Sequence, residues 1–341
     1  MKVLFIGGTG VISSAVSALA VEKGIELYLL NRGTRNNFVP KGAMILKGDI
    51  RDADSVAATV RPHRFDAVAD WISFVPEHVE NDIKLFSGIT RQFIFISTAS
   101  AYQRPVRHYM IDESTPLDNP FWQYSRDKIA CEERLMKEYR ENGFPVTIVR
   151  PSYTYNKTTI PFLFNSREHR WTIVDRMKKG KKIIVPGDGT SLFTVTHNSD
   201  FAKGFVGLVG NYQSIGHAFH ITSDEVLTWD QIAHAIGAAA GVEPDIIHVS
   251  SDFICKVAPE YTGGLLGDKT VSIVFDNSKI KRFVPDFRAT MPFSEGIRQS
   301  ISWYESDPRL CTTDQGFNEL SDRIIKGWEK GIEAAKLPAN D

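Results

Sequence analysis

The chain has 341 residues, and its 40 lysines and arginines nearly balance its 41 aspartates and glutamates, leaving a net charge of −1. This length predicts one large domain with a smaller one, and the near-neutral charge argues against a general nucleic-acid or membrane-surface binder. The three cysteines have neither metal-ligand spacing nor an even count for disulfides, so we expect no metal site and a reducing, cytoplasmic setting. Beyond the first residues, no apolar run approaches the roughly 18 residues of a membrane span.

The opening stretch, MKVLFIGGTGVISSAVSALA, has the lysine, the apolar run and the small residues of a secretory signal peptide. Its glycines favour another interpretation, because each glycine would weaken a signal-peptide helix by roughly 1 kcal/mol. A buried strand over Lys2–Ile6, a glycine turn and a helix from Val11 form the strand–turn–helix context that a dinucleotide fingerprint requires.

The glycine turn has the spacing Gly7-x-x-Gly10-x-x-Ser13. Gly7 allows a tight turn, Gly10 allows the backbone to approach a pyrophosphate, and the helix that follows presents free N–H groups to the anion. Ser13 replaces the glycine that usually allows close helix–strand packing. We therefore expect Gly7, Thr9, Gly10 and Ile12 to bind a dinucleotide cofactor.

Strand-like apolar runs alternate with helical patterns through the first half of the chain. Strands are expected at Lys2–Gly7, Glu26–Leu30, Ala43–Lys47, Ala67–Trp71, Gln92–Ser97 and Val146–Arg150, and helices near 12–23, 52–60, 76–86 and 122–142. This alternation predicts an α/β fold with a Rossmann-type, doubly wound parallel sheet.

The alternation ends at Arg150-Pro151, after which the pattern is mixed. We expect helices near 168–179, 199–209, 229–240, 294–305 and 315–331, and strands at Ile183–Val185, Phe193–Thr196 and Ala218–Ile221. The predicted NAD(P)-binding domain covers 1–151, with about 193–212 returning to it. A smaller mixed α/β substrate-binding domain covers 152–192 and 213–335.

The second strand ends at Leu30-Asn31-Arg32, where an acidic residue would favour NAD and an arginine NADP. Asn31 can bond a ribose hydroxyl without repelling a phosphate, and Arg32 or Arg35 could pair with one, so the cofactor is NAD or NADP. Two solvated loop arginines are the alternative. Three further residues follow the third and fourth strands and are expected at the adenine and beside the cofactor: Asp49, Ile50 and Trp71. Core packing is an equal alternative for Trp71.

Tyr124 and Lys128 lie four residues apart and share one face of a predicted helix. A tyrosine base working near pH 7 needs its pKa lowered by about 3 from 10, and an adjacent ammonium favours the phenolate. Thr98, at the end of the fifth strand, can bond a substrate oxygen, with Ser100 as a second contributor; turn capping is the alternative for each hydroxyl.

A second match to the same Tyr-x-x-x-Lys spacing occurs at Tyr153 and Lys157. It follows Pro151 directly and runs into a segment with another proline, so we do not expect its two side chains to share a helix face.

With these motifs in place, the chain resembles the extended short-chain dehydrogenase/reductase superfamily, in the NAD-dependent epimerase/dehydratase branch that includes UDP-galactose 4-epimerase. The resemblance rests on GGTGVIS, STASAY, YSRDK, RPSYTYN, PGDGTSLFTVTHNSDFA, FHITSDEVLTWDQIA and DNSKIKRFVPDF. It implies an NAD(P)-dependent enzyme that moves hydride, with Tyr124 as acid/base, Thr98 as its hydrogen-bonding partner and Lys128 as ribose anchor. It also implies Pro151 at the cofactor, Ser100 and Tyr153 at a sugar-like substrate between the domains, and a homodimer.

Two departures from the family narrow the expected chemistry. Thr98 is followed by Ala99-Ser100 rather than the Asp-Glu of 4,6-dehydratases, which argues against dehydration. Leu192 stands where nucleotide-sugar members usually carry a phosphate-binding arginine, so the sugar either lacks a nucleotide or has its phosphates held elsewhere. We expect an epimerase, in which the keto intermediate recovers its hydride on the other face; a plain dehydrogenase would use the same triad.

A binding protein without turnover is the rival class. The Asn31-Arg32-Gly33 turn and the spacing between Asp70-Trp71 and Pro76-Glu77 are similar to those of plastid stem-loop RNA-binding relatives. The basic run at 176–182 offers an RNA contact, or simply a solvated helix end. Thr98, Tyr124 and Lys128 are all present, which a pure binder would not need, and they favour the enzyme.

Overall fold

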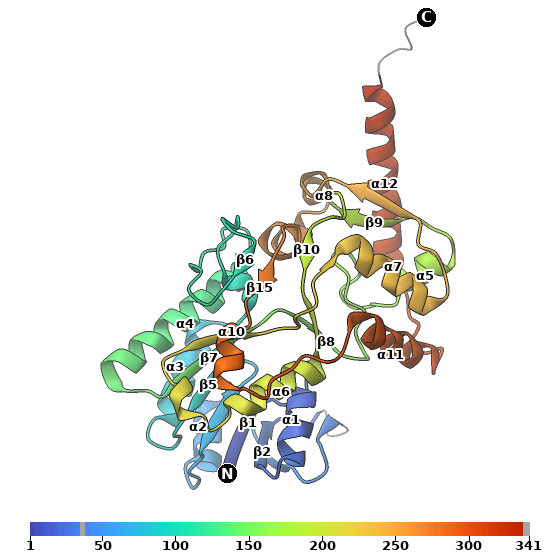
Figure 1. Cartoon of the computed structure of the whole chain (residues 1–341). Coiled ribbons are helices and arrows are strands. Elements are labelled where there is room, and N and C mark those ends of the chain that lie inside the picture. Colours follow the sequence, from blue (N-terminus) through green and yellow to red (C-terminus); the bar gives the residue numbers. More distant parts are fainter. Residues whose placement is uncertain (35–37, 337–341) are drawn as a thin grey trace, which may run out of the picture. The chain divides into compact units, whose positions relative to one another are not determined.

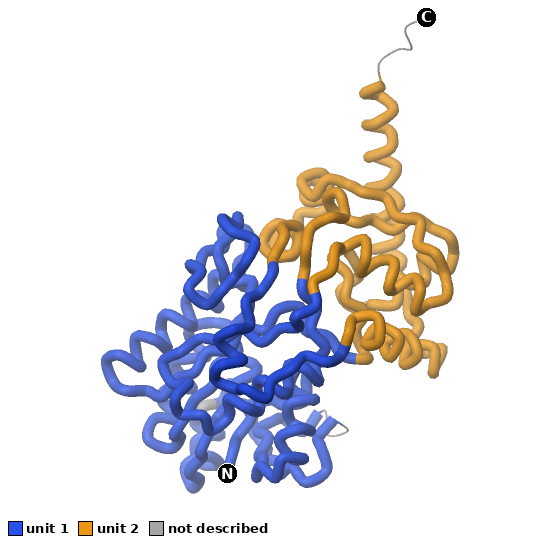
Figure 2. The backbone as a smooth tube through the Cα atoms, in the orientation of Figure 1, with its two compact units in different colours: residues 1–156, 194–225, 274–291 blue, residues 157–193, 226–273, 292–341 orange. Residues whose placement is uncertain are grey.

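The structure is a computed structural model that describes residues 1–34 and 38–336. The chain forms two compact units (Figure 2). Unit 1 contains residues 1–156, 194–225 and 274–291, and unit 2 contains residues 157–193, 226–273 and 292–341. Each unit is therefore assembled from three separate stretches of the chain.

Within the described residues, unit 1 contains a seven-stranded parallel sheet in the order β12, β7, β5, β4, β1, β2, β3. Figure 1 labels β7, β5, β1 and β2 among these strands. The strands are β1 Lys2–Ile6, β2 Glu26–Asn31, β3 Met44–Lys47, β4 Ala67–Asp70, β5 Phe93–Ile96, β7 Val146–Pro151 and β12 Ala218–Ile221. The strand order reverses beside β1, which is where doubly wound folds bind ligands at the carboxyl ends of their strands. The predicted fold class is confirmed.

Helices cover both faces of this sheet. Val3 and Phe5 of β1 are buried against α1 (Ser13–Glu22) and α6 (Asn198–Leu208), while Leu4 and Ile6 are buried against the other helices. Those helices are α2 (Ala53–Val60), α3 (Pro76–Phe86) and α4 (Gln123–Asn142). Because successive side chains of a strand point to opposite faces, an uninterrupted apolar strand needs a helical layer on each side.

The smaller elements of unit 1 extend from the sheet. Strand β8 (Tyr153–Tyr155) pairs in parallel with β11 (Val195–His197), and β6 (Met110–Ile111) pairs in parallel with β15 (Val274–Phe275). Helix α10 (Ser278–Phe283) packs beside β12.

Unit 2 is a small mixed α/β body. Its strands pair as β9 (Ile183–Pro186) with β14 (Ile246–Val249) and β10 (Leu192–Phe193) with β13 (Leu227–Thr228). Its helices are α5 Thr172–Lys178, α7 Trp229–Ala240, α8 Ser251–Val257, α9 Thr262–Gly264, α11 Phe293–Glu305 and α12 Gln315–Ala335. Aromatic pairs fill its core; the rings of Phe193 and Trp229, for example, lie 4.9 Å apart.

The unit boundaries differ from the domain limits expected from the sequence. Residues 213–225 and 274–291 fold with unit 1, because β12 pairs with β7 and buries Phe219 and Ile221 in the sheet's core. The single strand expected at Phe193–Thr196 is two strands, β10 and β11, which pair in different units. The first difference arises because the sequence of a strand as short as β12 does not indicate that it pairs with β7, some 70 residues earlier in the chain.

Candidate functional site

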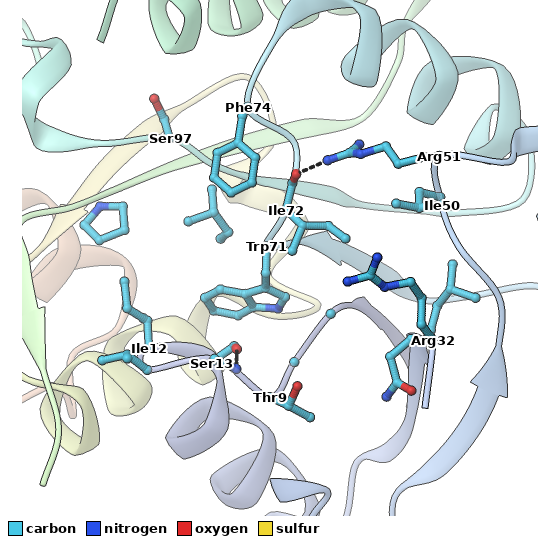
Figure 3. A pocket seen from close by; sticks show the side chains of 18 of the residues that line it. Thr9, Ile12, Ser13, Arg32, Ile50, Arg51, Trp71, Ile72, Phe74 and Ser97 are labelled. Carbon is cyan, nitrogen blue, oxygen red and sulfur yellow. Dashed lines mark hydrogen bonds between the residues drawn. The ribbon is translucent and has the colours of Figure 1, made fainter. Parts of the chain in front are cut away.

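A cavity of about 650 Å³ opens at the carboxyl ends of the sheet strands in unit 1 (Figure 3). Its lining comes from the glycine turn, the ends of β2, β4, β5 and β7, and the first turns of α4. It brings together ten residues expected at the cofactor and the three catalytic candidates: Gly7, Thr9, Gly10, Ile12, Asn31, Arg32, Asp49, Ile50, Trp71 and Pro151, with Thr98, Tyr124 and Lys128.

Close packing and two side-chain hydrogen bonds hold the conformation of the glycine turn. Gly7 and Gly8 have positive φ values of 97° and 91°, and a Cβ at Gly8 would lie 2.7 Å from the side chain of Leu29. The N–H of Gly10 donates to Oγ of Ser13 at 2.9 Å, and Ser17 Oγ donates to the carbonyl of Gly8 at 2.8 Å. Ser13, which replaces the usual glycine of the fingerprint, thus stabilises the turn by accepting the hydrogen bond from Gly10.

A residue that sequence analysis missed supports the turn from α6. Nδ2 of Asn198 donates to the carbonyl of Val11 at 2.8 Å, which ties the first turn of α6 to the start of α1. No local signal marks this asparagine, because its partner lies 187 residues earlier in the chain.

Where the cavity meets the end of β2, that strand supplies a basic side chain and no carboxylate. Asn31 Oδ1 accepts the N–H of Gly33 at 2.9 Å, and Arg32 lies next to it with its guanidinium 3.8 Å from the carboxylate of Asp49. The Arg32 side chain is 69% exposed, so this ion pair is weak. Arg35 lies outside the described residues.

Trp71 both packs in the core and lines the cavity, which are the two alternatives that the sequence left open. Its ring packs 4.7 Å from that of Phe205 in the core, and it also lines the cavity, where Figure 3 shows it above Thr9 and Ser13. Its Nε1 is buried and has no hydrogen-bond partner among the described residues. A buried donor without a partner is costly, and a bound polar ligand could supply the acceptor.

Tyr124 and Lys128 stand one turn apart at the start of α4, and both line the cavity. Lys128 is only 2% exposed, and its Nζ donates to the carbonyls of Ser73 at 2.5 Å and Ile96 at 2.6 Å. Burial lowers the pKa of Lys128 to about 8, and the nearby carboxylate of Asp70 acts in the opposite direction. This lysine is a buried cation whose charge depends on its neighbours.

Thr98 lines the cavity, but Ser100 does not. Thr98 Oγ1 accepts the N–H of Ser100 at 3.2 Å and caps the short helical turn Ala99–Ala101. Ser100 is 3% exposed, and its Oγ lies 2.9 Å from Thr98 Oγ1 and 2.7 Å from Oγ of Ser125. Ser100 therefore orients Thr98 from behind instead of facing a ligand in this cavity.

Tyr153 also lies outside the cavity lining, as the first residue of β8. Because Tyr153–Tyr155 is a strand, the second Tyr-x-x-x-Lys match does not form a helix face, as the prolines predicted. Among the lining residues that sequence analysis did not single out are Arg51, Ile72, Phe74, Ser97 and Ser152. Ile72, Ser97 and Ser152 closely follow strand ends, so the strand-end rule could have found them; Arg51 and Phe74 carry no such signal.

The described residues form neither a metal-binding cluster of acidic, histidine or cysteine side chains nor a helix able to span a membrane. Among residues 1–34 and 38–336, no cluster of three or more His, Cys, Asp or Glu side chains is placed to bind a metal ion. In that same part of the chain, no helix has the length and apolar character needed to span a membrane.

Comparison with known proteins agrees with this geometry. Residues 3–222 match the model of the NAD dependent epimerase/dehydratase family. A chloroplast stem-loop binding protein of 41 kDa b from Arabidopsis thaliana is 28% identical over 263 residues, which cover 72% of this chain and 65% of the relative. A UDP-glucose 4-epimerase from Lactobacillus helveticus is 30% identical over 170 residues, covering 44% of this chain and 51% of the relative. The chain thus spans about two thirds and one half of these relatives.

Solved structures match over a longer span at lower identity. UDP-glucose 4-epimerase of Thermus thermophilus in complex with NAD superposes with a TM-score of 0.69 at 21% identity, covering 89% of this chain and 99% of that one. A dTDP-glucose 4,6-dehydratase of Bacillus anthracis in complex with NAD gives a TM-score of 0.71 at 17% identity, covering 91% and 98%. At these identities the likeness establishes the shared fold.

Proposed function

Because this chain belongs to the NAD-dependent epimerase/dehydratase family, we propose that it is an NAD(P)-dependent epimerase or oxidoreductase acting on a sugar or nucleotide sugar. The observation that carries the proposal is that Thr98, Tyr124 and Lys128 line the same cavity as the glycine turn. A protein that only binds a ligand would not need an acid/base, a hydroxyl that hydrogen-bonds a substrate oxygen and a buried ammonium beside a dinucleotide site.

The residues of the cavity fit a dinucleotide. The turn at Gly7 and Gly10 and the start of α1 would hold the pyrophosphate, the ribose would lie at Lys128, and Trp71 Nε1 lacks a partner among the described residues. When bound, the cofactor accepts or returns a hydride at its nicotinamide ring.

Side chains of the cavity transfer the proton of the substrate hydroxyl and stabilise the charge on its oxygen. Tyr124 takes the proton of a substrate hydroxyl and returns it, and the Lys128 ammonium favours the phenolate that this requires. Thr98 donates a hydrogen bond to the substrate oxygen, with its hydroxyl oriented by Ser100. Ala99 follows Thr98 where dehydratases carry an acid, so we propose hydride transfer without loss of water.

Substrate screening tests this proposal and separates epimerase from dehydrogenase. The purified protein is incubated with UDP-glucose and with a panel of free sugars, each with NAD or NADP, and products are followed by NMR. We expect an epimer to form without net cofactor reduction. Reduction of added cofactor in proportion to substrate would replace the epimerase with a dehydrogenase, and failure to bind either cofactor would overturn the enzyme assignment.

We propose that the end of the cavity formed by Asn31 and Arg32 holds the adenosine ribose and accepts NADP. Replacing Arg32 with alanine should weaken NADPH binding by roughly tenfold while changing NADH binding by less than about twofold, because only NADPH offers a 2′-phosphate for a charge-assisted hydrogen bond. Isothermal titration with both cofactors measures this, with Arg61→Ala at the end of α2 as an exposed control. An equal loss for both cofactors would contradict the proposed role of Arg32.

Stem-loop RNA binding is the second candidate, because the Arabidopsis relative is described as a stem-loop binding protein. The basic run at 176–182 gives it little support, since its side chains pair with acids of unit 2. The pairs are Arg176–Asp322, Lys178–Glu305, Lys179–Asp175, Lys181–Asp322 and Lys182–Glu329. We expect no binding to a stem-loop RNA tighter than about 1 μM at physiological salt. A tighter, saturable mobility shift would favour the RNA-binding class.

The cellular setting and assembly also belong to the proposal. The three cysteines, Cys131, Cys255 and Cys311, are free thiols, which fits a reducing, cytoplasmic setting. The family resemblance leads us to propose a homodimer. Light scattering on the full chain tests this state directly, and a monomer at micromolar concentration would contradict it.

A further inference from the structure

Two carboxyl groups are completely buried beneath the cavity. Asp70 ends β4 and Asp82 lies on α3, and each has 0% exposure. The hydroxyl of Ser73 bridges them, with Oγ 2.6 Å from Asp70 Oδ2 and 2.8 Å from Asp82 Oδ2. Two buried acids this close to one hydroxyl cannot both be ionised without a large cost, so the arrangement constrains the number of protons it holds.

The hydrogen-bond donors around the two carboxyls place the proton on Asp82. The one hydrogen of the Ser73 hydroxyl cannot be donated to both carboxyls. Asp70 receives the N–H groups of Ile72 at 2.6 Å and Ser73 at 3.0 Å in addition to the hydroxyl, whereas Asp82 Oδ1 has no partner among the described residues. Asp70 is therefore the carboxylate, and Asp82 is the acid that donates to Ser73. Burial, together with the neighbouring Asp70, raises the pKa of Asp82 well above its usual range.

The bridge also touches the lysine of the cavity. Lys128 Nζ donates to the carbonyl of Ser73, and it lies 4.9 Å and 4.7 Å from the ring centres of Phe74 and Phe95. The charged and titratable side chains around it come from several elements: Asp70 of β4, Arg51, His78 of α3, and Cys131 and Glu132 of α4.

We propose that Asp70, Ser73 and Asp82 are positioning residues that share one proton and hold a single negative charge beneath Lys128. Asp70 compensates the buried ammonium, Asp82 completes the bridge without adding a second charge, and Ser73 holds both carboxyls and Lys128 Nζ. The link to catalysis rests on the proposed function of Lys128 as ribose anchor, but the proton count does not.

Infrared spectroscopy of the full chain tests the proton count. At pH 7 an ordinary carboxyl is ionised, so a protonated Asp82 should give a C=O stretching band that disappears in Asp82→Asn. Glu77→Gln, an exposed acid at the start of the same helix, is the matched control and should keep the band. A band of equal size in the wild type and Asp82→Asn, or no band in the wild type, would overturn the shared proton.

The pH dependence of NADPH binding tests the charge beneath Lys128. Wild-type affinity should fall as pH rises through about 8, since Lys128 loses its proton there. Asp70→Asn removes the compensating charge and should move this fall to lower pH by about one pH unit. Asp82→Asn should leave the pH at which NADPH affinity falls unchanged, because a neutral amide replaces a neutral acid. Both variants keep the side-chain shape, and near-ultraviolet circular dichroism checks that they fold.

The two measurements separate failure of this inference from failure of the proposed function. The positioning role would be overturned if NADPH affinity fell at the same pH in the wild type and Asp70→Asn. It would also be overturned if both variants moved that pH by the same amount. If the protein binds neither NADPH nor NADH at any pH, the proposed function fails, and the role at Lys128 fails with it. The infrared band still decides the proton count in that case.

Discussion

Replacing Tyr124 with phenylalanine should lower kcat by a factor of about 10² to 10⁴ on whichever substrate the screen identifies, while leaving cofactor affinity within about threefold. The reason is that the phenol supplies the proton transfer, whereas the glycine turn, Arg32 and Lys128 supply the proposed binding of the dinucleotide. Steady-state kinetics and NADPH titration on the same preparation measure both effects.

A matched control is available on the same helix. Tyr139 lies near the other end of α4 and does not line the cavity, so Tyr139→Phe should retain activity within about twofold. If Tyr124→Phe turns over as fast as the wild type, Tyr124 is not the acid/base and the proposed chemistry is wrong.

Glu132→Ala should lower the free energy of unfolding by about 3–5 kcal/mol, the largest stability effect that we expect from one substitution in unit 1. The carboxylate of Glu132 on α4 accepts hydrogen bonds from Nε of Arg150 on β7 at 3.0 and 3.2 Å and from its Nη2 at 2.6 Å. Their side chains are 3% and 6% exposed, so removing the carboxylate leaves a buried guanidinium without its counter-charge. Urea denaturation followed by circular dichroism measures the loss.

Two comparisons separate loss of the ion pair from a general weakening of the helix. Glu133→Ala, the exposed neighbour, should change stability by less than about 0.5 kcal/mol. The double variant Glu132→Leu with Arg150→Met should recover part of the loss, because it removes both charges and fills similar space. A double variant as unstable as Glu132→Ala alone would show that the stranded charge is not the cause.

The local part of the fold could be predicted because it depends on short-range patterns. Buried β1, the glycine turn and α1 are adjacent in the chain, and Tyr124 and Lys128 share a helix face through a spacing of four residues. Even where the fingerprint departs at Ser13, the replacement acts locally, accepting the N–H of Gly10 three residues away.

Ser100 and Trp71 mark the limit of that local reasoning. A hydroxyl two residues after Thr98 could face a ligand or lie behind the strand end, and packing against Ser125 on α4 decided the second. Trp71 could belong to the core or to the cavity, and its contact with Phe205 of α6 allows it to belong to both.

By itself, the sequence determined the class of fold, the glycine turn and the placing of a phenol and an ammonium on one helix face, since each needs only neighbours along a strand or helix. Tertiary structure alone decided that β12 joins β7, that Asn198 braces the glycine turn, and that Asp70 and Asp82 meet at Ser73 beneath Lys128. Charge and proton sharing between buried groups depend on distances of a few ångströms across separate elements, and no periodicity in the chain encodes such distances.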